Sequence, residues 1–182
     1  LRLCVGFWLR PLTAILVFLL ASLLPQALAQ TYPSKPIKLI IPFAAGSATD
    51  SAGHILGQAL SQRLGQNVVV DNRPGANGQI AATLAAQSAP DGYTLFMTTN
   101  STHSANPHLY KSLPYDPIND FEPIAHLGRL AFMLVVHPEL PVSNTRELIA
   151  YALAHPGELS YGTASTTSLV GGETINTMGH TD

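Results

Sequence analysis

Short apolar runs alternate along this chain with segments whose apolar residues fall at helical spacing. The apolar runs cover residues 37–43, 67–71 and 93–99, and each predicts a strand. Residues 52–64 and the alanine-rich stretch 79–87 predict helices between these strands. Strands that alternate with helices pack as a parallel sheet covered by helices on both faces. We therefore expect an α/β fold.

The second half of the chain has a less regular pattern. Four prolines within residues 107–123 predict a loop or a set of turns. Residues 131–137 and 159–163 predict two further strands, the first of which would begin a new sheet. Asn144, followed by an acidic residue three positions later, is typical of a helix start. A weaker helical pattern covers residues 170–178.

The first 29 residues have the three parts of an export signal. Arg2 and Arg10 supply positive charge, and residues 12–24 form an apolar core. Ala27 and Ala29 then give the small-x-small pattern of a cleavage site. A membrane anchor is the alternative, but spanning a bilayer takes about 20 apolar residues and this core is shorter. A cleaved signal peptide over residues 1–29 is expected.

The charge balance argues against nucleic acid as a partner. The chain carries 9 basic and 11 acidic residues, and removal of Arg2 and Arg10 with the signal would make it more acidic. Binding to phosphates requires a basic face. The single cysteine, Cys4, lies within the predicted signal, so we expect neither a disulfide nor thiol chemistry in the exported part.

Two loops share one design, in which a strand ends, small and hydroxyl residues follow, and a helix begins. They cover residues 44–50 and 164–168. In a parallel sheet such loops lie at the carboxyl ends of strands, where ligands bind. Free N–H groups at a helix start, together with hydroxyls, suit an anion such as a carboxylate or a phosphate. The alternative is that these loops are only tight turns with helix caps.

Enzyme signatures are largely absent from the sequence. There is no dinucleotide-binding, P-loop or nucleophile-elbow motif. The seven histidines are scattered without metal-site spacing, so neither a metal nor a cofactor is expected. Asp50 is a candidate base or partner for a ligand amine, although an aspartate at a helix start commonly just stabilises the dipole. An α/β enzyme with Asp50 and His103 as its acid–base pair remains the alternative class of function.

Five ordered motifs resemble one family. They are Tyr-Pro-x-Lys-Pro-Ile at 32–37, Pro-Phe-Ala-Ala-Gly-Ser-Ala-Thr-Asp at 42–50, Asn-Arg-Pro-Gly-Ala-Asn-Gly at 72–78, Ala-Pro-Asp-Gly-Tyr-Thr-Leu at 89–95, and Leu-Pro-Tyr-Asp-Pro-x-x-Asp-Phe-x-Pro-Ile at 113–124. Together they are similar to the Bug family, the extracytoplasmic solute receptors of tripartite tricarboxylate transporters. The resemblance covers essentially the whole chain after the predicted signal.

The resemblance implies a type II-like, two-lobed periplasmic binding protein without enzymatic activity. Residues 30–127 would form the first α/β lobe and residues 128–182 the start of the second, whose C-terminal part would be missing from this chain. A monomeric receptor would then capture a small carboxylate in the periplasm and deliver it to the membrane subunits of a transporter. A module of the same fold that serves a sensor is the alternative within this class.

The resemblance also implies that the carboxylate is held by backbone groups, hydroxyls and water rather than by a basic side chain. The implied ligand-binding residues are Phe43, Ala44, Ala45, Gly46, Ser47, Thr49, Asp50, Ser101, Thr102, His103, Ser165, Thr166 and Thr167. Ser47 departs from the family pattern, which usually has a second glycine at this position. The loop that contains Ser165 is shorter than the common glycine-containing form.

Overall fold

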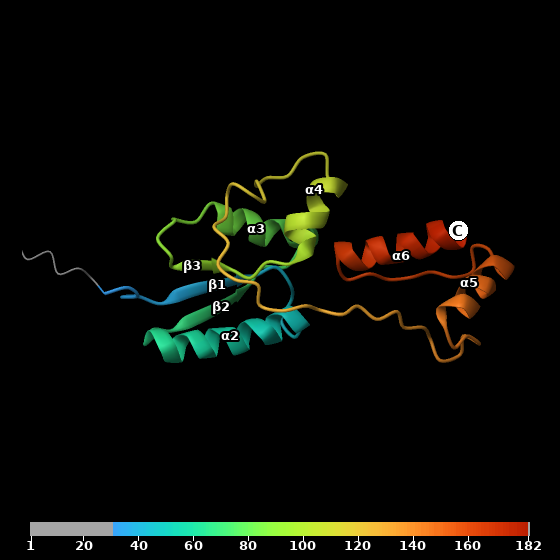
Figure 1. The fold of residues 1–182 in the computed structure, drawn as a ribbon, viewed down its shortest axis with the longest axis horizontal. Coiled ribbons are helices and arrows are strands. Elements are labelled where there is room, and N and C mark those ends of the chain that lie inside the picture. The colour runs from blue at the N-terminus through green and yellow to red at the C-terminus, as the bar shows by residue number, and fades with distance from the viewer. Residues whose placement is uncertain (1–30, 182) are drawn as a thin grey trace, which may run out of the picture. The chain divides into compact units, whose positions relative to one another are not determined.

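The computed structural model describes residues 31–181 (Figure 1). The predicted signal peptide at 1–29 lies outside the described residues. Residues 35–182 form one compact unit. No helix within residues 31–181 combines the length and the apolar character needed to cross a bilayer.

A parallel sheet of three strands forms the centre of the first half of the unit. Its strands are β1 (Ile37–Ile41), β2 (Val68–Asn72) and β3 (Thr94–Phe96), in the order β2-β1-β3. Leu39 of the central strand pairs with Val70 on one side and with Leu95 on the other. The expected α/β fold is confirmed, although β3 is shorter than the apolar run that predicted it.

Helices cover both faces of this sheet, with α2 and α3 on opposite sides (Figure 1). The remaining helical elements follow β3 in the chain, apart from one short turn before α3. The bounds are α2 (Ala48–Leu64), η1 (Ala76–Gly78), α3 (Gln79–Ala86), the π-helical turn η2 (Ser101–Ala105), α4 (Asn106–Leu109), α5 (Thr145–Ala154) and α6 (Thr166–Gly179).

The core lies between α2 and the sheet. Ile37, Leu39 and Ile41 occupy every second position of β1, so their side chains lie on the same face of the sheet and point toward α2. Each of them is at most 1% exposed. Ile40 is fully buried as well, so the central strand is covered on both faces. The helix approaches the sheet closely, because a Cβ atom at Gly53 would lie 2.2 Å from Cδ1 of Ile41. This packing fixes the carboxyl end of β1, where the first predicted binding loop begins.

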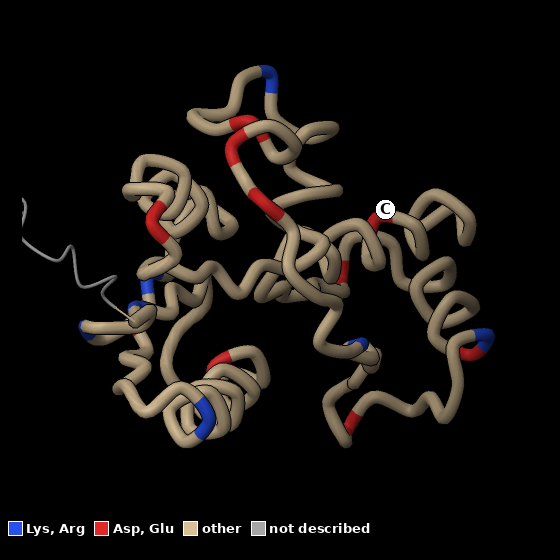
Figure 2. The backbone as a smooth tube through the Cα atoms, turned by 60° about the vertical axis from the view of Figure 1, so that its left-hand side comes forward, with Lys and Arg blue, Asp and Glu red and all other residues tan. Residues whose placement is uncertain are grey.

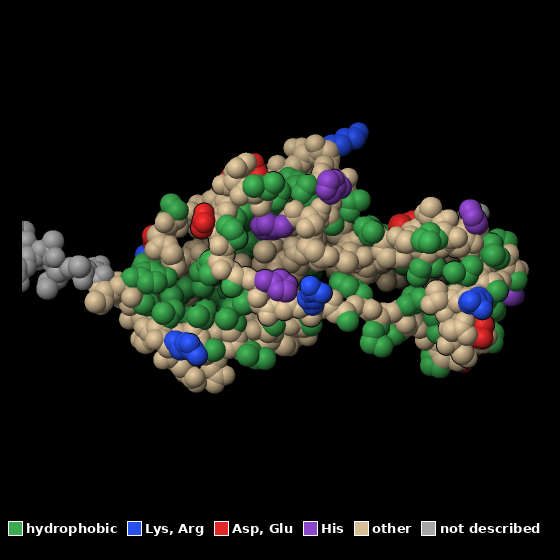
Figure 3. Space-filling model, viewed as in Figure 1, with side chains coloured by type: hydrophobic (Ala, Val, Ile, Leu, Met, Phe, Trp, Pro, Cys, Tyr) green, Lys and Arg blue, Asp and Glu red, His purple; other side chains and the backbone are tan. Residues whose placement is uncertain are grey.

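Two strand predictions in the second half are wrong. Residues 131–137 and 159–163 are extended, but neither forms a ladder with any strand among the described residues. The apolar side chains of the first segment are open on the surface (Figure 3), and Met133 and Val135 are 84% and 79% exposed. A strand is stable only when its N–H and C=O groups find a partner, and residues 31–181 supply no partner for these two segments.

Both helices predicted in the second half are present. The Oδ1 atom of Asn144 accepts a hydrogen bond of 3.0 Å from the N–H of Glu147, so the predicted cap of α5 is confirmed. The Glu147 carboxylate in turn accepts from the N–H of Ser143 at 2.7 Å. Helix α6 begins at Thr166, four residues before the predicted pattern, because Ser165 caps it.

Candidate ligand-binding site

Three chain segments meet beyond the carboxyl ends of β1 and β3. Gly78 marks the meeting point, because a Cβ atom there would lie 2.5 Å from Cγ2 of Thr102 and 3.1 Å from Cβ of Pro42. Its φ of +84° is also a conformation that glycine adopts most easily. Pro42 leads into the first predicted binding loop and Thr102 belongs to η2, so the absence of a side chain at Gly78 lets the two approach.

The loop between β1 and α2 is closed by two reciprocal hydrogen bonds. Ser47 is the N-cap of α2, and its Oγ atom accepts from the N–H of Asp50 at 3.1 Å. The Oδ2 atom of Asp50 accepts from the N–H of Gly46 at 2.8 Å. Residues 44–46 are exposed, whereas Thr49 and Asp50 are buried. The loop therefore presents these three residues outward from a fixed base.

The Asp50 carboxylate braces this loop. Its Oδ1 atom accepts from Nδ2 of Asn72 at 2.8 Å, and the same amide group donates to the Phe43 carbonyl at 3.1 Å. The Nε2 atom of His54 lies 3.4 Å from the Oδ1 atom of Asp50. The hydrogen bond from Gly46 lowers the pKa of Asp50 most, followed by that from Asn72, while burial opposes them and His54 adds a smaller decrease. Both carboxylate oxygens are thus occupied by the protein itself.

Sequence reasoning missed Asn72, which ties the loop to the sheet. It is the last residue of β2, directly beside the end of β1 in the parallel register. An amide side chain at the carboxyl end of a strand that neighbours the loop is a signal that could have been used.

Ser101 and Thr102 of η2 are buried, at 2% and 0% exposure. Thr102 donates its hydroxyl proton to the Thr99 carbonyl at 3.0 Å, and its own carbonyl accepts from the Tyr115 hydroxyl at 2.6 Å. The Thr98 and Thr102 hydroxyls are also hydrogen-bonded to each other. Thr102 therefore holds η2 in place, and its side chain does not face open space.

His103 is half-buried among aromatic side chains. Its ring centroid lies 4.8 Å from that of Phe121 and 6.0 Å from that of Phe96. Its Nδ1 atom lies 2.6 Å from Oγ1 of Thr98. Burial lowers the pKa of His103 below the ordinary value of 6.5, which favours the neutral imidazole.

This burial makes a prediction about pH. A histidine whose pKa is lower in the folded state leaves stability unchanged above the unfolded value, and stability is lost as the pH falls from there toward the folded pKa. We expect the melting temperature to fall between about pH 7 and pH 5, and the variant His103→Gln to reduce this fall. The matched control is His108→Gln at an exposed position, which should keep the wild-type slope. Equal slopes in wild type and His103→Gln would contradict the prediction.

The N terminus of α6 brings the predicted loop at residues 164–168 to η2. Ser165 caps the helix in a capping box, in which its Oγ atom accepts from the N–H of Ser168 at 3.3 Å and the Ser168 hydroxyl accepts from the N–H of Ser165 at 3.1 Å. The hydroxyls of Thr167 and Ser101 lie 3.4 Å apart. The predicted binding residues of η2 and of the loop at residues 164–168 are therefore in direct contact, through side chains that are 66 positions apart in the sequence.

The predicted loops contain no Lys or Arg side chain. Lys and Arg are sparse along the described chain (Figure 2), and Lys35 and Arg73 already pair with Asp91 at 3.1 Å and with Asp71 at 2.8 Å. Within residues 31–181 no group of three His, Cys, Asp or Glu side chains is placed to hold a metal ion. An anion at this site would be held by helix N-termini and hydroxyl groups.

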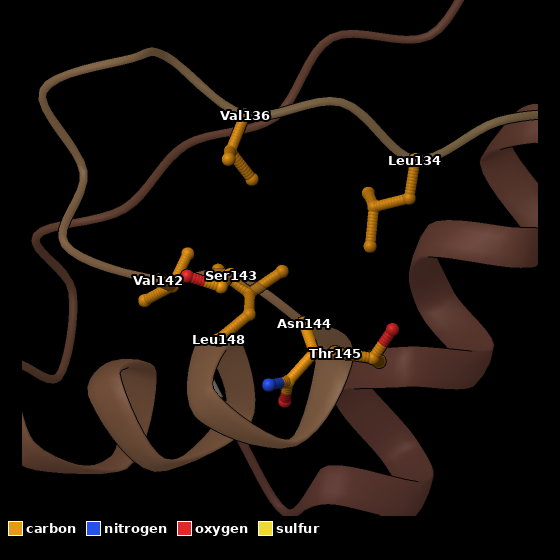
Figure 4. Close-up of a pocket in the computed structure, with 7 residues that line it drawn as sticks. All are labelled: Leu134, Val136, Val142, Ser143, Asn144, Thr145 and Leu148. Atoms are coloured by element: carbon orange, nitrogen blue, oxygen red, sulfur yellow. The ribbon is translucent and has the colours of Figure 1, made fainter.

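A separate small cavity of about 150 Å³ lies beside α5 (Figure 4). Side chains of the extended segment before α5 face the first turn of that helix across it (Figure 4). None of the predicted binding residues lines this cavity, whose lining residues are Leu134, Val136, Val142, Ser143, Asn144, Thr145 and Leu148.

The α/β sheet and the serine-capped helix starts at its carboxyl edge are features of ligand-binding proteins of the periplasmic type. Residues 54–179 match the family model described as the tripartite tricarboxylate transporter family receptor. This chain belongs to that family, as the motifs indicated. BugT of Bordetella pertussis is 40% identical over 134 residues, which are 73% of this chain and 41% of BugT. The chain spans about half the length of the curated relatives it matches.

Solved structures of similar proteins show the same fold. The protein Rpa4515 of Rhodopseudomonas palustris, determined with adipate, is 35% identical with a TM-score of 0.79, over 83% of this chain and 51% of that protein. MatC of Rhodopseudomonas palustris, with bound malate, is 30% identical with a TM-score of 0.73, over 83% of this chain and 52% of MatC. These neighbours confirm the fold of a periplasmic binding protein for this chain.

Proposed function

We propose that this chain is part of a periplasmic receptor that captures a small dicarboxylate and delivers it to the membrane subunits of a tripartite tricarboxylate transporter. One observation carries the proposal: α2 and α6 both begin at a serine cap, the start of α6 contacts η2, and neither helix start carries a Lys or Arg side chain. The adipate and malate bound by the neighbouring proteins are both dicarboxylates and support this ligand class.

The chemistry of the proposed grip follows from the helix starts. The first N–H groups of a helix have no partner within it, and they carry partial positive charge. Ala48 and Thr49 occupy these positions in α2, and Thr166 and Thr167 occupy them in α6. Each helix start would receive one carboxylate, while the hydroxyls of Ser47 and Thr167 supply further donors. The ligand would then be recognised by its two carboxylates and by their separation.

Within the same proposal, the exposed residues Ala44 and Ala45 contribute backbone N–H groups, because the N–H of Gly46 is engaged by Asp50, and half-buried Phe43 and His103 provide apolar contact. The side chains of Thr102, Thr166, Asp50 and Ser101 are buried and would hold the loops rather than touch the ligand, so Thr166 would contribute only its backbone N–H group. Residues 30–127 and 128–182 would belong to two lobes that close on the ligand. A signal peptide at 1–29 would direct the receptor to the periplasm, where the family delivers its ligands to a transporter.

The arrangement of Asp50 and His103 favours binding over catalysis. Asp50 is engaged by Gly46 and Asn72, and the Nδ1 atom of His103 is engaged by Thr98. In the part of the chain that the structure describes, the Asp50 carboxylate and the His103 ring form neither a hydrogen bond nor an ion pair with each other. A proton transfer from one to the other has no supporting geometry here.

Calorimetric titration of the full-length receptor of which this chain would be part tests the proposal. We expect saturable binding of adipate or malate. Hexanoate has as many carbons as adipate but one carboxylate, and it should bind more weakly by about tenfold or more. The ligand should be recovered unchanged, as followed by NMR. Absence of heat with every dicarboxylate tried would contradict the proposal, and so would conversion of the ligand.

A further inference from the structure

The buried amide of Asn106 joins three separate parts of the chain. Asn106 is the first residue of α4 and is 0% exposed. Its Nδ2 group donates to the Asn77 carbonyl at 3.0 Å and to the Tyr115 hydroxyl at 3.4 Å. Its Oδ1 atom accepts from the Thr166 hydroxyl at 3.1 Å. One side chain thus connects η1, the loop after α4 and the first residue of α6.

Side-chain hydrogen bonds to Asn106 and Ser101 join α6 to the part of the chain that contains the sheet. Within residues 31–181 these bonds are Thr166 to Asn106 and Thr167 to Ser101, at 3.1 and 3.4 Å. The Asn106 bond is the shorter, and it is buried on both sides. A buried hydrogen bond between well-packed partners is costly to leave unmade, because each freed polar atom then lacks water.

The position of this bond matters for the ligand. Thr166 is the first residue of α6, so the bond holds the end of the helix whose N–H groups are free. Asn77 precedes Gly78, which lies against Thr102 and Pro42 at the entrance of the first loop. The Asn106 amide therefore links the residues that frame the first loop to the start of α6, which lies in the predicted loop at residues 164–168.

We propose that Asn106 is a positioning residue of the ligand site, which sets the N terminus of α6 relative to η2 and the first loop. This inference rests on the proposed function and adds a residue that the motifs do not mark as a ligand contact. An asparagine suits the role because it offers a donor to carbonyl and hydroxyl groups on one side and an acceptor to a hydroxyl on the other. Leucine has a similar size and offers neither.

The first test compares Asn106→Leu with Ser61→Ala. Both variants remove hydrogen bonds inside the protein, so both should lower the melting temperature. The Ser61 hydroxyl donates to the Gly57 carbonyl and accepts from the N–H of Val68, away from the capped start of α2, so Ser61→Ala should retain the wild-type affinity for adipate in calorimetry. Asn106→Leu should weaken adipate binding by about tenfold in the protein that remains folded. Wild-type affinity in folded Asn106→Leu would overturn the inference, as would equal affinity losses in both variants.

A second measurement does not depend on the ligand. Spin labels at the exposed positions Gln58 of α2 and Thr177 of α6, in a Cys4→Ser background, report the placement of α6 by pulsed electron resonance. The distance distribution should be broader in Asn106→Leu than in the wild type. Thr166→Val removes the same bond from the other side and should broaden it too, which keeps the test decisive if Asn106→Leu does not fold. Unchanged distributions in both Asn106→Leu and Thr166→Val would overturn the inference.

The two measurements separate this inference from the proposed function. If the wild-type protein binds no dicarboxylate, the proposed function fails whatever the variants do. The spin-label distances alone then decide whether Asn106 holds α6. If the wild type binds adipate and the distances do not respond to Asn106→Leu, the proposed function stands and the positioning role fails.

Discussion

Replacing Gly78 by alanine is expected to destabilise the chain by about 3 kcal/mol. Two costs add. A left-handed φ of +84° is unfavourable for a residue with a Cβ atom, and that atom would lie 2.5 Å from Cγ2 of Thr102 and 3.1 Å from Cβ of Pro42. Urea unfolding followed by circular dichroism measures the free energy. Because the clash pushes η2 away from the first loop, adipate affinity should fall as well.

Gly65→Ala separates these two costs. Gly65 ends α2 with a φ of +66°, and a Cβ atom there would have no heavy atom within 4 Å. Only the backbone cost then applies, and we expect a loss of about 1 kcal/mol with no change in adipate affinity. If Gly65→Ala and Gly78→Ala lose the same free energy, the close approach of η2 and the first loop contributes nothing to stability.

The first half of the fold could be predicted because its signals are local. Strand β1 is buried on both faces, and a strand of this kind appears in the sequence as a continuous apolar run. The end of α2 was marked by Gly65, which adopts the left-handed conformation that ends many helices. Both signals lie within a few residues of the structure they predict.

The second half shows where such signals stop. Residues 131–137 have the composition of a strand, but composition states a preference and does not supply a partner. Pairing depends on another strand elsewhere in a chain, and no partner for this segment lies in residues 31–181. The exposed side chains of Met133 and Val135 are the physical result. The composition of a segment can therefore predict its preference for a strand, but not whether the strand forms.

The candidate site divides in the same way. Ser47 and Ser165 could be identified from their position before a helical pattern, because a cap bonds to a residue three positions later. Asn106 could not, because the Thr166 hydroxyl that it bonds is 60 positions away. Asn72 bonds the Phe43 carbonyl 29 positions away, and its only signal was its place at the carboxyl end of a predicted strand. Such partners follow from the packing of the sheet and its helices rather than from any local pattern. The residues that hold the loops are thus harder to predict than the loops.

The carboxylate of Asp50 is the group whose role the structure changes most. As a candidate partner for a ligand amine, it would need a free oxygen. Its Oδ2 atom accepts from Gly46 and its Oδ1 atom from Asn72, and its side chain is 8% exposed. The lowered pKa of Asp50 agrees with a carboxylate stabilised in its charged form by these donors. We therefore expect Asp50 to act on the ligand only by shaping the loop.

Asp50→Ala is accordingly expected to weaken plain and amine-bearing dicarboxylates alike, by about tenfold each, because the loop loses its preorganised shape. Malate and aspartate form a matched pair for calorimetry, since they differ in a hydroxyl against an amine. Asp91→Ala is the control, because Asp91 pairs with Lys35 at an exposed site, where such pairs contribute little. It should leave both affinities unchanged.

The pH dependence of Asp50 provides a second check. Its folded pKa is lowered from 3.8, so its contribution to stability is present above that value and is lost as the pH falls through the folded pKa. Asp50→Ala should therefore reduce stability at neutral pH and flatten the acid limb below about pH 4, without altering the fall near pH 6 that we assign to His103. In the affinity comparison, a larger loss for aspartate than for malate in Asp50→Ala would contradict this role. It would show that an oxygen of Asp50 reaches the ligand, and that the loop opens when the ligand binds.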